Sequence, residues 1–182
     1  MSNWKITKEA SIYFVTTTIV NWYPVFTSKS YFQLITDSLQ YCRRNKGLNI
    51  HSYVIMLNHV HLLASVEDDD PKILSSIFRD LKRFTSNEIT KKLREDSKNT
   101  ALSVFKRAAK NDERGNHYKV WQDGFHPKAV LKEQFGKQKL DYIHKNPVRK
   151  GYVLEPSDWR YSSAGYYSGQ SNYELEIDDI FS

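Results

Sequence analysis

The chain of 182 residues contains a single cysteine, Cys42, which excludes an intramolecular disulfide and any zinc site built from several cysteines. No apolar run approaches the length of a membrane span, and the amino-terminal residues contain no apolar signal core. The sequence also has no internal repeat and no low-complexity tract. We therefore expect a cytoplasmic protein that is not bound to a membrane.

Apolar and basic residues are, in contrast, plentiful. Hydrophobic residues make up 40% of the chain and aromatic residues 14%, which is enough for a real core. We expect one domain over residues 1–182, with a core at about 10–153 and a carboxy-terminal tail at 154–182. Lys and Arg outnumber Asp and Glu by 27 to 21, giving a net charge of +6. This excess favours a polyanionic partner such as nucleic acid, although an ordinary basic protein has the same balance.

The order of apolar and turn residues predicts both strands and helices. A run of β-branched and aromatic residues predicts a central strand over 11–20. Residues 49–57 and 59–66 are predicted as a hairpin that turns near Asn58, because one strand of that length would be unusually long. Helical spacing predicts helices over 31–46, 72–93 and 135–146, the last ended by Pro147, and a short helix over 101–110. The predicted buried stripe of the second helix is Ile73, Ile77, Leu81 and Phe84.

Two histidines, His59 and His61, lie one residue apart in the second strand of the predicted hairpin. Because side chains alternate along a strand, both imidazoles project from one face while Val60 faces a core. Two neutral imidazoles on one face can bind a metal ion, although histidines that only make hydrogen bonds give the same pattern. The pair also resembles histidine-triad nucleotide hydrolases, but their third alternating histidine is replaced here by Leu63.

Tyr142 and Asn146 are four residues apart in the last predicted helix, so they share one helix face. Placed against the histidines, the Asn146 amide would complete a three-ligand metal site beside a tyrosine nucleophile. Nitrogen and oxygen ligands without thiolate suit Mg²⁺ or Mn²⁺. Such a site suits transesterification at a phosphodiester through a covalent phosphotyrosine. The alternatives are a packing tyrosine and an asparagine that ends a helix.

Taken together, these motifs resemble the REP-associated tyrosine transposases, within the single-tyrosine HUH transposases. The resemblance extends over nearly the whole chain, and the combination of His-x-His with Tyr-Ile-His-x-Asn-Pro-Val-Arg is specific. One departure is Tyr161, where the family often has tryptophan. The segments that carry the resemblance are residues 12–18, 53–63, 79–86, 121–122, 140–151 and 161–164.

The resemblance implies an α+β fold with a ferredoxin-like antiparallel sheet and helices packed on it. It implies that His59, His61 and Asn146 bind the metal and that Tyr142 attacks single-stranded DNA, forming a 5′-phosphotyrosine. The implied enzyme is a transposase and endonuclease that nicks and rejoins DNA near short palindromic hairpins, as a monomer or a homodimer. The alternative is a regulator on the same fold that binds DNA hairpins without cleaving them.

Several side chains are predicted to contact DNA, although such charges often form only a solvated face. The predicted backbone contacts are Arg79, Lys82, Arg83, Arg149 and Lys150. Trp121 and His126 complete the set, since aromatic side chains can stack on unpaired bases and a histidine can polarise a phosphate or cap a turn. The acidic residues 174–179 should not touch DNA, and we expect them to pack over the basic site or to shield it.

Overall fold

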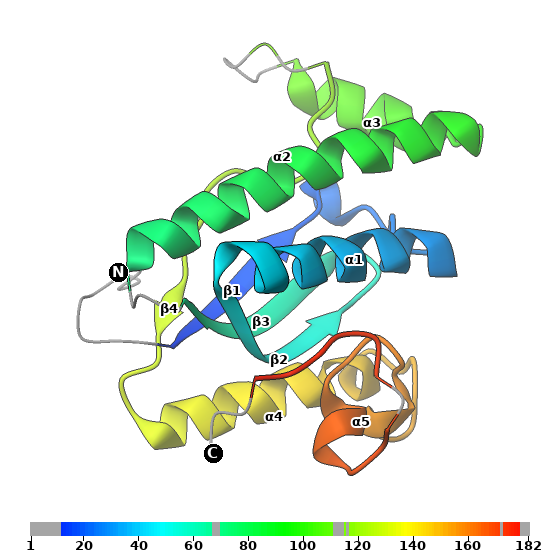
Figure 1. Cartoon of the computed structure of the whole chain (residues 1–182). Coiled ribbons are helices and arrows are strands. Elements are labelled where there is room, and N and C mark those ends of the chain that lie inside the picture. The colour runs from blue at the N-terminus through cyan, green and yellow to red at the C-terminus, as the bar shows by residue number, and fades with distance from the viewer. Residues whose placement is uncertain (1–11, 67–69, 111–114, 116, 172, 179–182) are drawn as a thin grey trace.

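Four antiparallel strands form a sheet in the computed structural model of this chain, which describes residues 12–66, 70–110, 115, 117–171 and 173–178 (Figure 1). The strands are β1 (Tyr13–Thr18), β2 (Leu48–Ile55), β3 (His59–Val66) and β4 (Lys128–Ala129), in the order β2-β3-β1-β4. The helices are α1 (Lys29–Lys46), α2 (Pro71–Glu95), α3 (Asn99–Ala109), α4 (Glu133–Arg149) and α5 (Ala164–Tyr167). Short 3₁₀ turns occupy η1 (Val20–Trp22) and η2 (Pro156–Asp158).

The strand order and the succession of strands and helices from β1 to β4 are those of a ferredoxin-like α+β fold, as predicted. The strand predicted over 11–20 is shorter, at Tyr13–Thr18, and residue 11 lies outside the described residues. The predicted hairpin is confirmed, because Met56 N–H donates to the carbonyl of His59 where β2 turns into β3. Within the described part of the chain, no helix is long and apolar enough to cross a membrane.

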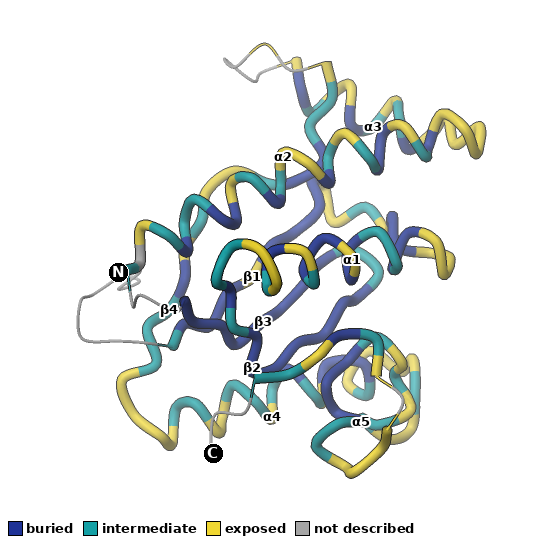
Figure 2. Tube along the Cα trace, viewed as in Figure 1, coloured by how far each residue is buried: buried dark blue, intermediate teal, exposed yellow. Residues whose placement is uncertain are grey.

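Helices cover both faces of the sheet (Figures 1 and 2). Val15, Val60 and Leu62 belong to the main core, together with buried residues of α1 and α2. Phe14 and Leu63 project to the opposite face, where they pack with Ile143 of α4. This alternation follows from the two-residue period of a strand. Side chains of β1 and β3 that do not enter the main core therefore face α4.

Two predictions about helices are wrong. Phe84 is 56% exposed, because the helical period places Thr85 on the inward face of α2, where its hydroxyl donates to the carbonyl of Leu81. Helix α4 does not end before Pro147 but continues to Arg149. A proline so near the helix end removes a single backbone hydrogen bond, and the chain leaves the helix at Gly151, which has a φ of 71°.

The acidic tail packs along α1 and the free edge of β2, so the predicted packing over the basic site is wrong for its described part. Arg43 of α1 pairs with Glu176 at 2.5 Å and with Asp178 at 2.6 Å. The Asp178 backbone N–H donates to the carbonyl of Ile50, and the Asp178 carboxylate accepts from Ile50 N–H. The tail thereby satisfies backbone groups at an edge that would otherwise be open to pairing. Residue 179 lies outside the described residues.

Candidate active site

His59 and His61 project from β3 toward α4, on the same side of the sheet as the sequence predicts. Each side chain is 6% exposed, and their ring centroids are 4.7 Å apart. Val60 lies between them and is buried in the main core on the other face. The two imidazoles therefore form a close pair in a largely dry environment.

The Nδ1 atoms of both histidines are engaged by neighbouring side chains. The Asn58 side chain donates from Nδ2 to the carbonyl of Trp22. In this orientation, Asn58 Oδ1 faces His59 Nδ1 at 2.7 Å. That oxygen can only accept, so the proton of His59 is on Nδ1 and the lone pair on Nε2. His61 Nδ1 lies 2.7 Å from the hydroxyl of Thr16 on β1. In the tautomer that donates to Thr16, His61 also presents an Nε2 lone pair, as metal-binding histidines do.

Burial keeps both imidazoles neutral. Burial, together with the charge of Lys150, lowers the pKa of His59 to about 4. Burial also lowers the pKa of His61 to about 3, with smaller contributions from His59 and Lys139. At pH 7 each ring is therefore neutral and has one nitrogen without a proton. A neutral imidazole is the form that binds a metal ion.

Tyr142 of α4 reaches the histidine pair. Its ring lies 5.2 Å from that of His61 and 6.0 Å from that of Phe14, both edge-on. The side chain is half-buried, and no described residue forms a hydrogen bond with its hydroxyl. The structure therefore brings together the two parts of the site, which are about 80 residues apart in the sequence.

Two cations flank the Tyr142 ring. The Arg149 guanidinium lies 5.3 Å from the ring centroid, and the Lys139 ammonium lies 5.5 Å from it. Lys139 also lies 4.8 Å from the centre of the Phe14 ring. Lys139 is not among the residues predicted from the sequence, although it precedes Tyr142 by three residues on the same helix and so shares its face. These cations add positive charge where a phosphate would approach the tyrosine.

Asn146 lies one turn beyond Tyr142 on α4 and is 5% exposed. Among the described residues, no hydrogen-bond partner takes up its side-chain amide, so the amide oxygen is available to a ligand. No group of three His, Cys, Asp or Glu side chains in that part of the chain is placed to hold a metal ion. The two imidazoles and the Asn146 amide oxygen remain the predicted ligands, and nitrogen and oxygen donors of this kind suit Mg²⁺ or Mn²⁺.

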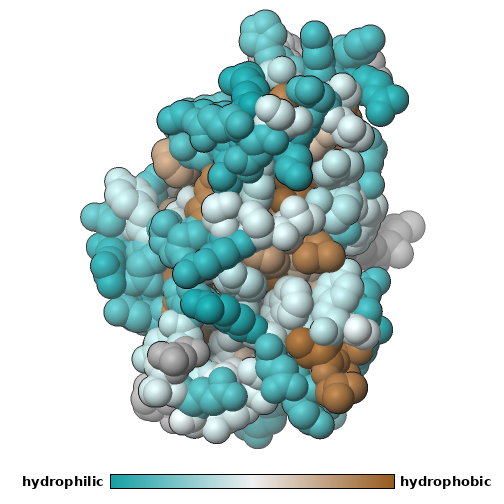
Figure 3. All heavy atoms as spheres, turned by 90° about the vertical axis from the view of Figure 1, so that its right-hand side faces the viewer, coloured by the Kyte–Doolittle hydropathy of each residue, from teal (hydrophilic) through white to brown (hydrophobic). Residues whose placement is uncertain are grey.

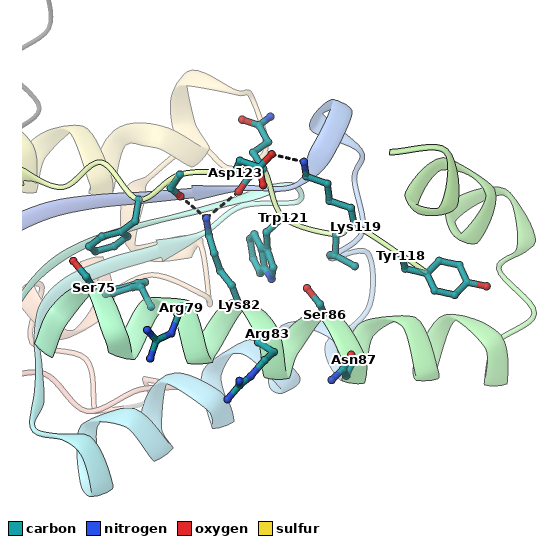
Figure 4. Close-up of a pocket in the computed structure, with 15 residues that line it drawn as sticks. Ser75, Arg79, Lys82, Arg83, Ser86, Asn87, Tyr118, Lys119, Trp121 and Asp123 are labelled. Carbon is teal, nitrogen blue, oxygen red and sulfur yellow. Dashed lines mark hydrogen bonds and ion pairs between the residues drawn. The ribbon is translucent and has the colours of Figure 1, made fainter. Parts of the chain in front are cut away.

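The predicted basic residues of α2 lie on the other face of the sheet from Tyr142. Arg79 and Arg83 have side chains 73% and 77% exposed and line a cavity of about 480 Å³ between α2 and residues 118–125 (Figure 4). Lys82 donates to the carbonyls of Gln122 and Gly124, so it ties this loop to α2. Hydrophilic side chains are dense over the end of the molecule where α2 and α3 lie (Figure 3).

Trp121 and His126, the other predicted DNA contacts, differ in exposure. Trp121 is 6% exposed, and its indole N–H donates to the Thr85 hydroxyl at 2.9 Å. This burial argues against the predicted stacking of Trp121 on a base. His126 is exposed and lies against Gly124, where a Cβ would overlap its ring. Neither residue is brought next to Tyr142 by any contact that the structure shows.

The buried histidines predict how stability changes with pH in metal-free buffer. Burial lowers the pKa of His144 on α4 to about 4, as it lowers those of His59 and His61. Below pH 6.5 each of these histidines becomes protonated in the unfolded chain but not in the folded one, so acid favours unfolding. We expect the free energy of unfolding to fall from pH 6.5 to 5 by about 1 kcal/mol per pH unit for each histidine.

Urea denaturation between pH 7 and 5 measures this dependence. His144→Gln should remove the part of the slope that comes from one histidine, because glutamine does not titrate. A slope that is the same in wild type and in His144→Gln would contradict the assignment of His144 as a neutral, partly buried imidazole.

The fold and the site together define an α+β protein in which two histidines of an inner strand face a tyrosine on a helix. No model of a known protein family matches the chain. The chain is, however, similar to two curated proteins. It is 22% identical over 132 residues to a REP-associated tyrosine transposase of Escherichia coli, a match that covers 72% of this chain and 64% of that protein. It is 31% identical over 109 residues to a putative REP-associated tyrosine transposase of Haemophilus influenzae, a match that covers 60% of this chain and 54% of that protein.

A solved structure supports the same relationship at the level of the fold. It is described as a REP-associated tyrosine transposase bound to a REP hairpin, and it superposes with a TM-score of 0.65 at 21% identity. The match covers 100% of this chain and 94% of that one. The chain spans a little over half to two thirds of the curated relatives that it matches. The resemblance predicted from the motifs is confirmed: this chain is similar in sequence and in fold to REP-associated tyrosine transposases.

Proposed function

We propose that this protein is a metal-dependent enzyme that cleaves and rejoins single-stranded DNA next to short palindromic hairpins. The observation that carries the proposal is the contact between Tyr142 and His61, whose ring centroids are 5.2 Å apart. A tyrosine ring against one of two neutral, paired imidazoles, in a chain similar to tyrosine transposases, supports this proposal. The hairpin in the solved structure of similar fold supports hairpin DNA as the substrate class.

In the proposed reaction, the Tyr142 hydroxyl oxygen attacks the phosphorus of a phosphodiester. The new bond joins the tyrosine to the 5′ phosphate, the phosphorus–3′-oxygen bond breaks, and the 3′ oxygen leaves as a hydroxyl. The phenol gives up its proton to solvent water, and the leaving oxygen takes one up from water, so the protons balance. Reversal with another 3′ hydroxyl rejoins the strand and frees the tyrosine, because the phosphotyrosine conserves the energy of the original bond.

His59, His61 and the Asn146 amide would hold a divalent ion such as Mg²⁺ or Mn²⁺. When bound, this ion supplies a Lewis acid for the phosphoryl oxygen and the leaving group. Thr16 and Asn58 orient the imidazoles through their Nδ1 atoms, so that Nε2 faces the ligand side. Lys139 and Arg149 neutralise the phosphate as it approaches Tyr142.

The cations of this protein support two separate roles. Lys139 and Arg149 of α4 lie next to the tyrosine, and Lys150 at the end of α4 acts on His59 through its charge, so all three suit the scissile phosphate. Arg79 and Arg83 lie across the sheet in the groove of Figure 4 and suit the backbone of a more distant part of the DNA, such as the hairpin stem.

The test is to incubate the protein with an end-labelled DNA hairpin that carries single-stranded flanks, in Mg²⁺, in Mn²⁺ and in EDTA. We expect a covalent protein–DNA adduct and a free 3′ hydroxyl fragment with either metal and neither product in EDTA. A fully paired duplex of the same sequence should give little product, because its scissile phosphate cannot enter the site alone. Tight hairpin binding without any metal-dependent adduct would instead identify a regulator that binds hairpins and does not cleave them.

A further inference from the structure

Trp22 is a large aromatic side chain that lies exposed beside the histidine pair. It is 58% exposed, and its ring centroid lies 5.7 Å from that of His59 with an interplanar angle of 72°. More than half of the residue is open to solvent, so Trp22 adds an exposed aromatic surface next to His59.

The backbone at this position is unusual for such a residue. Asn21 and Trp22 have φ angles of 55° and 53°, in the left-handed region that bulky side chains rarely adopt. Hydrogen bonds hold the turn in place. Asn58 Nδ2 donates to the carbonyl of Trp22, Tyr23 N–H donates to that of Val20, and Ile19 N–H donates to that of Asn58.

Packing does not explain why tryptophan occupies this position. More than half of the side chain is outside the core, and a glycine would adopt the same backbone geometry without strain. Strained residues that are not needed for packing are concentrated at functional sites. The Asn58 side chain forms hydrogen bonds with both residues, through Nδ2 with the Trp22 carbonyl and through Oδ1 with His59 Nδ1. The backbone of Trp22 is therefore held in place relative to His59.

We propose that Trp22 is a stacking platform for an unpaired base next to the phosphate bound at the histidine pair. This inference rests on the proposed function and adds a recognition element for the single-stranded flank. The π-face of an indole stacks on any base, so the contact would hold the strand without reading its sequence. Because Asn58 links the two residues, a base on Trp22 would place its phosphate near His59.

The experiment uses the Tyr142→Phe protein as parent, so that binding is measured without cleavage. Fluorescence anisotropy gives the affinity for a labelled hairpin with single-stranded flanks, in Mg²⁺. Trp22→Phe keeps an aromatic face, whereas Trp22→Leu keeps apolar bulk without one. The matched control is Tyr41→Ala, since Tyr41 is also 58% exposed but lies on α1, across the sheet from α4. A second series of DNAs carries one abasic site at each flank position in turn.

We expect Trp22→Leu to weaken binding roughly 10-fold and Trp22→Phe to weaken it much less. An abasic site at one flank position should weaken binding by the parent to a similar degree and should have no further effect on Trp22→Leu. Tyr41→Ala should bind like the parent. Tryptophan emission of the parent should be quenched by the intact flank and less by the abasic one.

Equal binding by the parent and Trp22→Leu, with no effect of any abasic site, would overturn the stacking role and leave the proposed function standing. A parent that binds no hairpin would overturn both. Circular dichroism checks that each variant is folded. The abasic DNAs test stacking with the parent protein, which retains Trp22, so this test does not depend on the folding of a Trp22 variant.

Discussion

Tyr142→Phe is expected to abolish the covalent protein–DNA adduct while leaving hairpin affinity within about two-fold of wild type. The substitution removes only the hydroxyl oxygen, so the ring keeps its contacts with His61 and Phe14. Without that oxygen the proposed bond to phosphorus cannot form. Adduct formation and strand rejoining should both fall by roughly a thousand-fold or more, as is usual when a nucleophile is removed.

The measurement is denaturing electrophoresis of labelled hairpin DNA after incubation with metal. Tyr152→Phe is the matched control, because Tyr152 is also partly exposed, follows directly after α4, and packs its ring 5.5 Å from that of Trp159. It should retain full activity. Undiminished adduct in Tyr142→Phe, or its loss in Tyr152→Phe alone, would assign the nucleophile to another tyrosine.

His61→Gln is the second substitution with a large expected effect. As a metal ligand, His61 should contribute about 100-fold or more to Mn²⁺ affinity. Even substitution of a residue that only orients a metal ligand weakens metal binding by about 10- to 100-fold. Glutamine keeps a polar group near the Thr16 hydroxyl, which bonds His61 Nδ1 in the native protein. The effect on folding should therefore be smaller than the effect on metal binding.

Titration with Mn²⁺, followed by electron paramagnetic resonance of the free ion, measures this affinity directly. His51→Gln is the control, because His51 is a buried histidine of the neighbouring strand whose ring bonds Ser65 and the Asp178 carbonyl. It should bind Mn²⁺ like wild type. If His61→Gln binds the ion as tightly as wild type does, the histidine pair does not hold the metal.

Much of the secondary structure could be predicted because it depends on residues close in sequence. The alternation along β3 places His59 and His61 on one face whatever the sheet around them looks like. The spacing of Tyr142 and Asn146 on a helix is likewise local. The prediction for Trp121 failed because of a distant contact. Trp121 is aromatic and near turns, but it is buried against α2, where its indole N–H donates to the Thr85 hydroxyl.

The sequence by itself thus determined the histidine pair, the tyrosine helix and, through its motifs, the relationship to tyrosine transposases. Only the tertiary structure decided that His61 and Tyr142 touch, that Arg79 and Arg83 lie across the sheet from them, and that Lys139 and Trp22 border the site. The physical reason is that periodicity fixes which face of an element a side chain occupies. It does not fix which other element packs on that face, since that depends on how all the apolar surfaces are buried together.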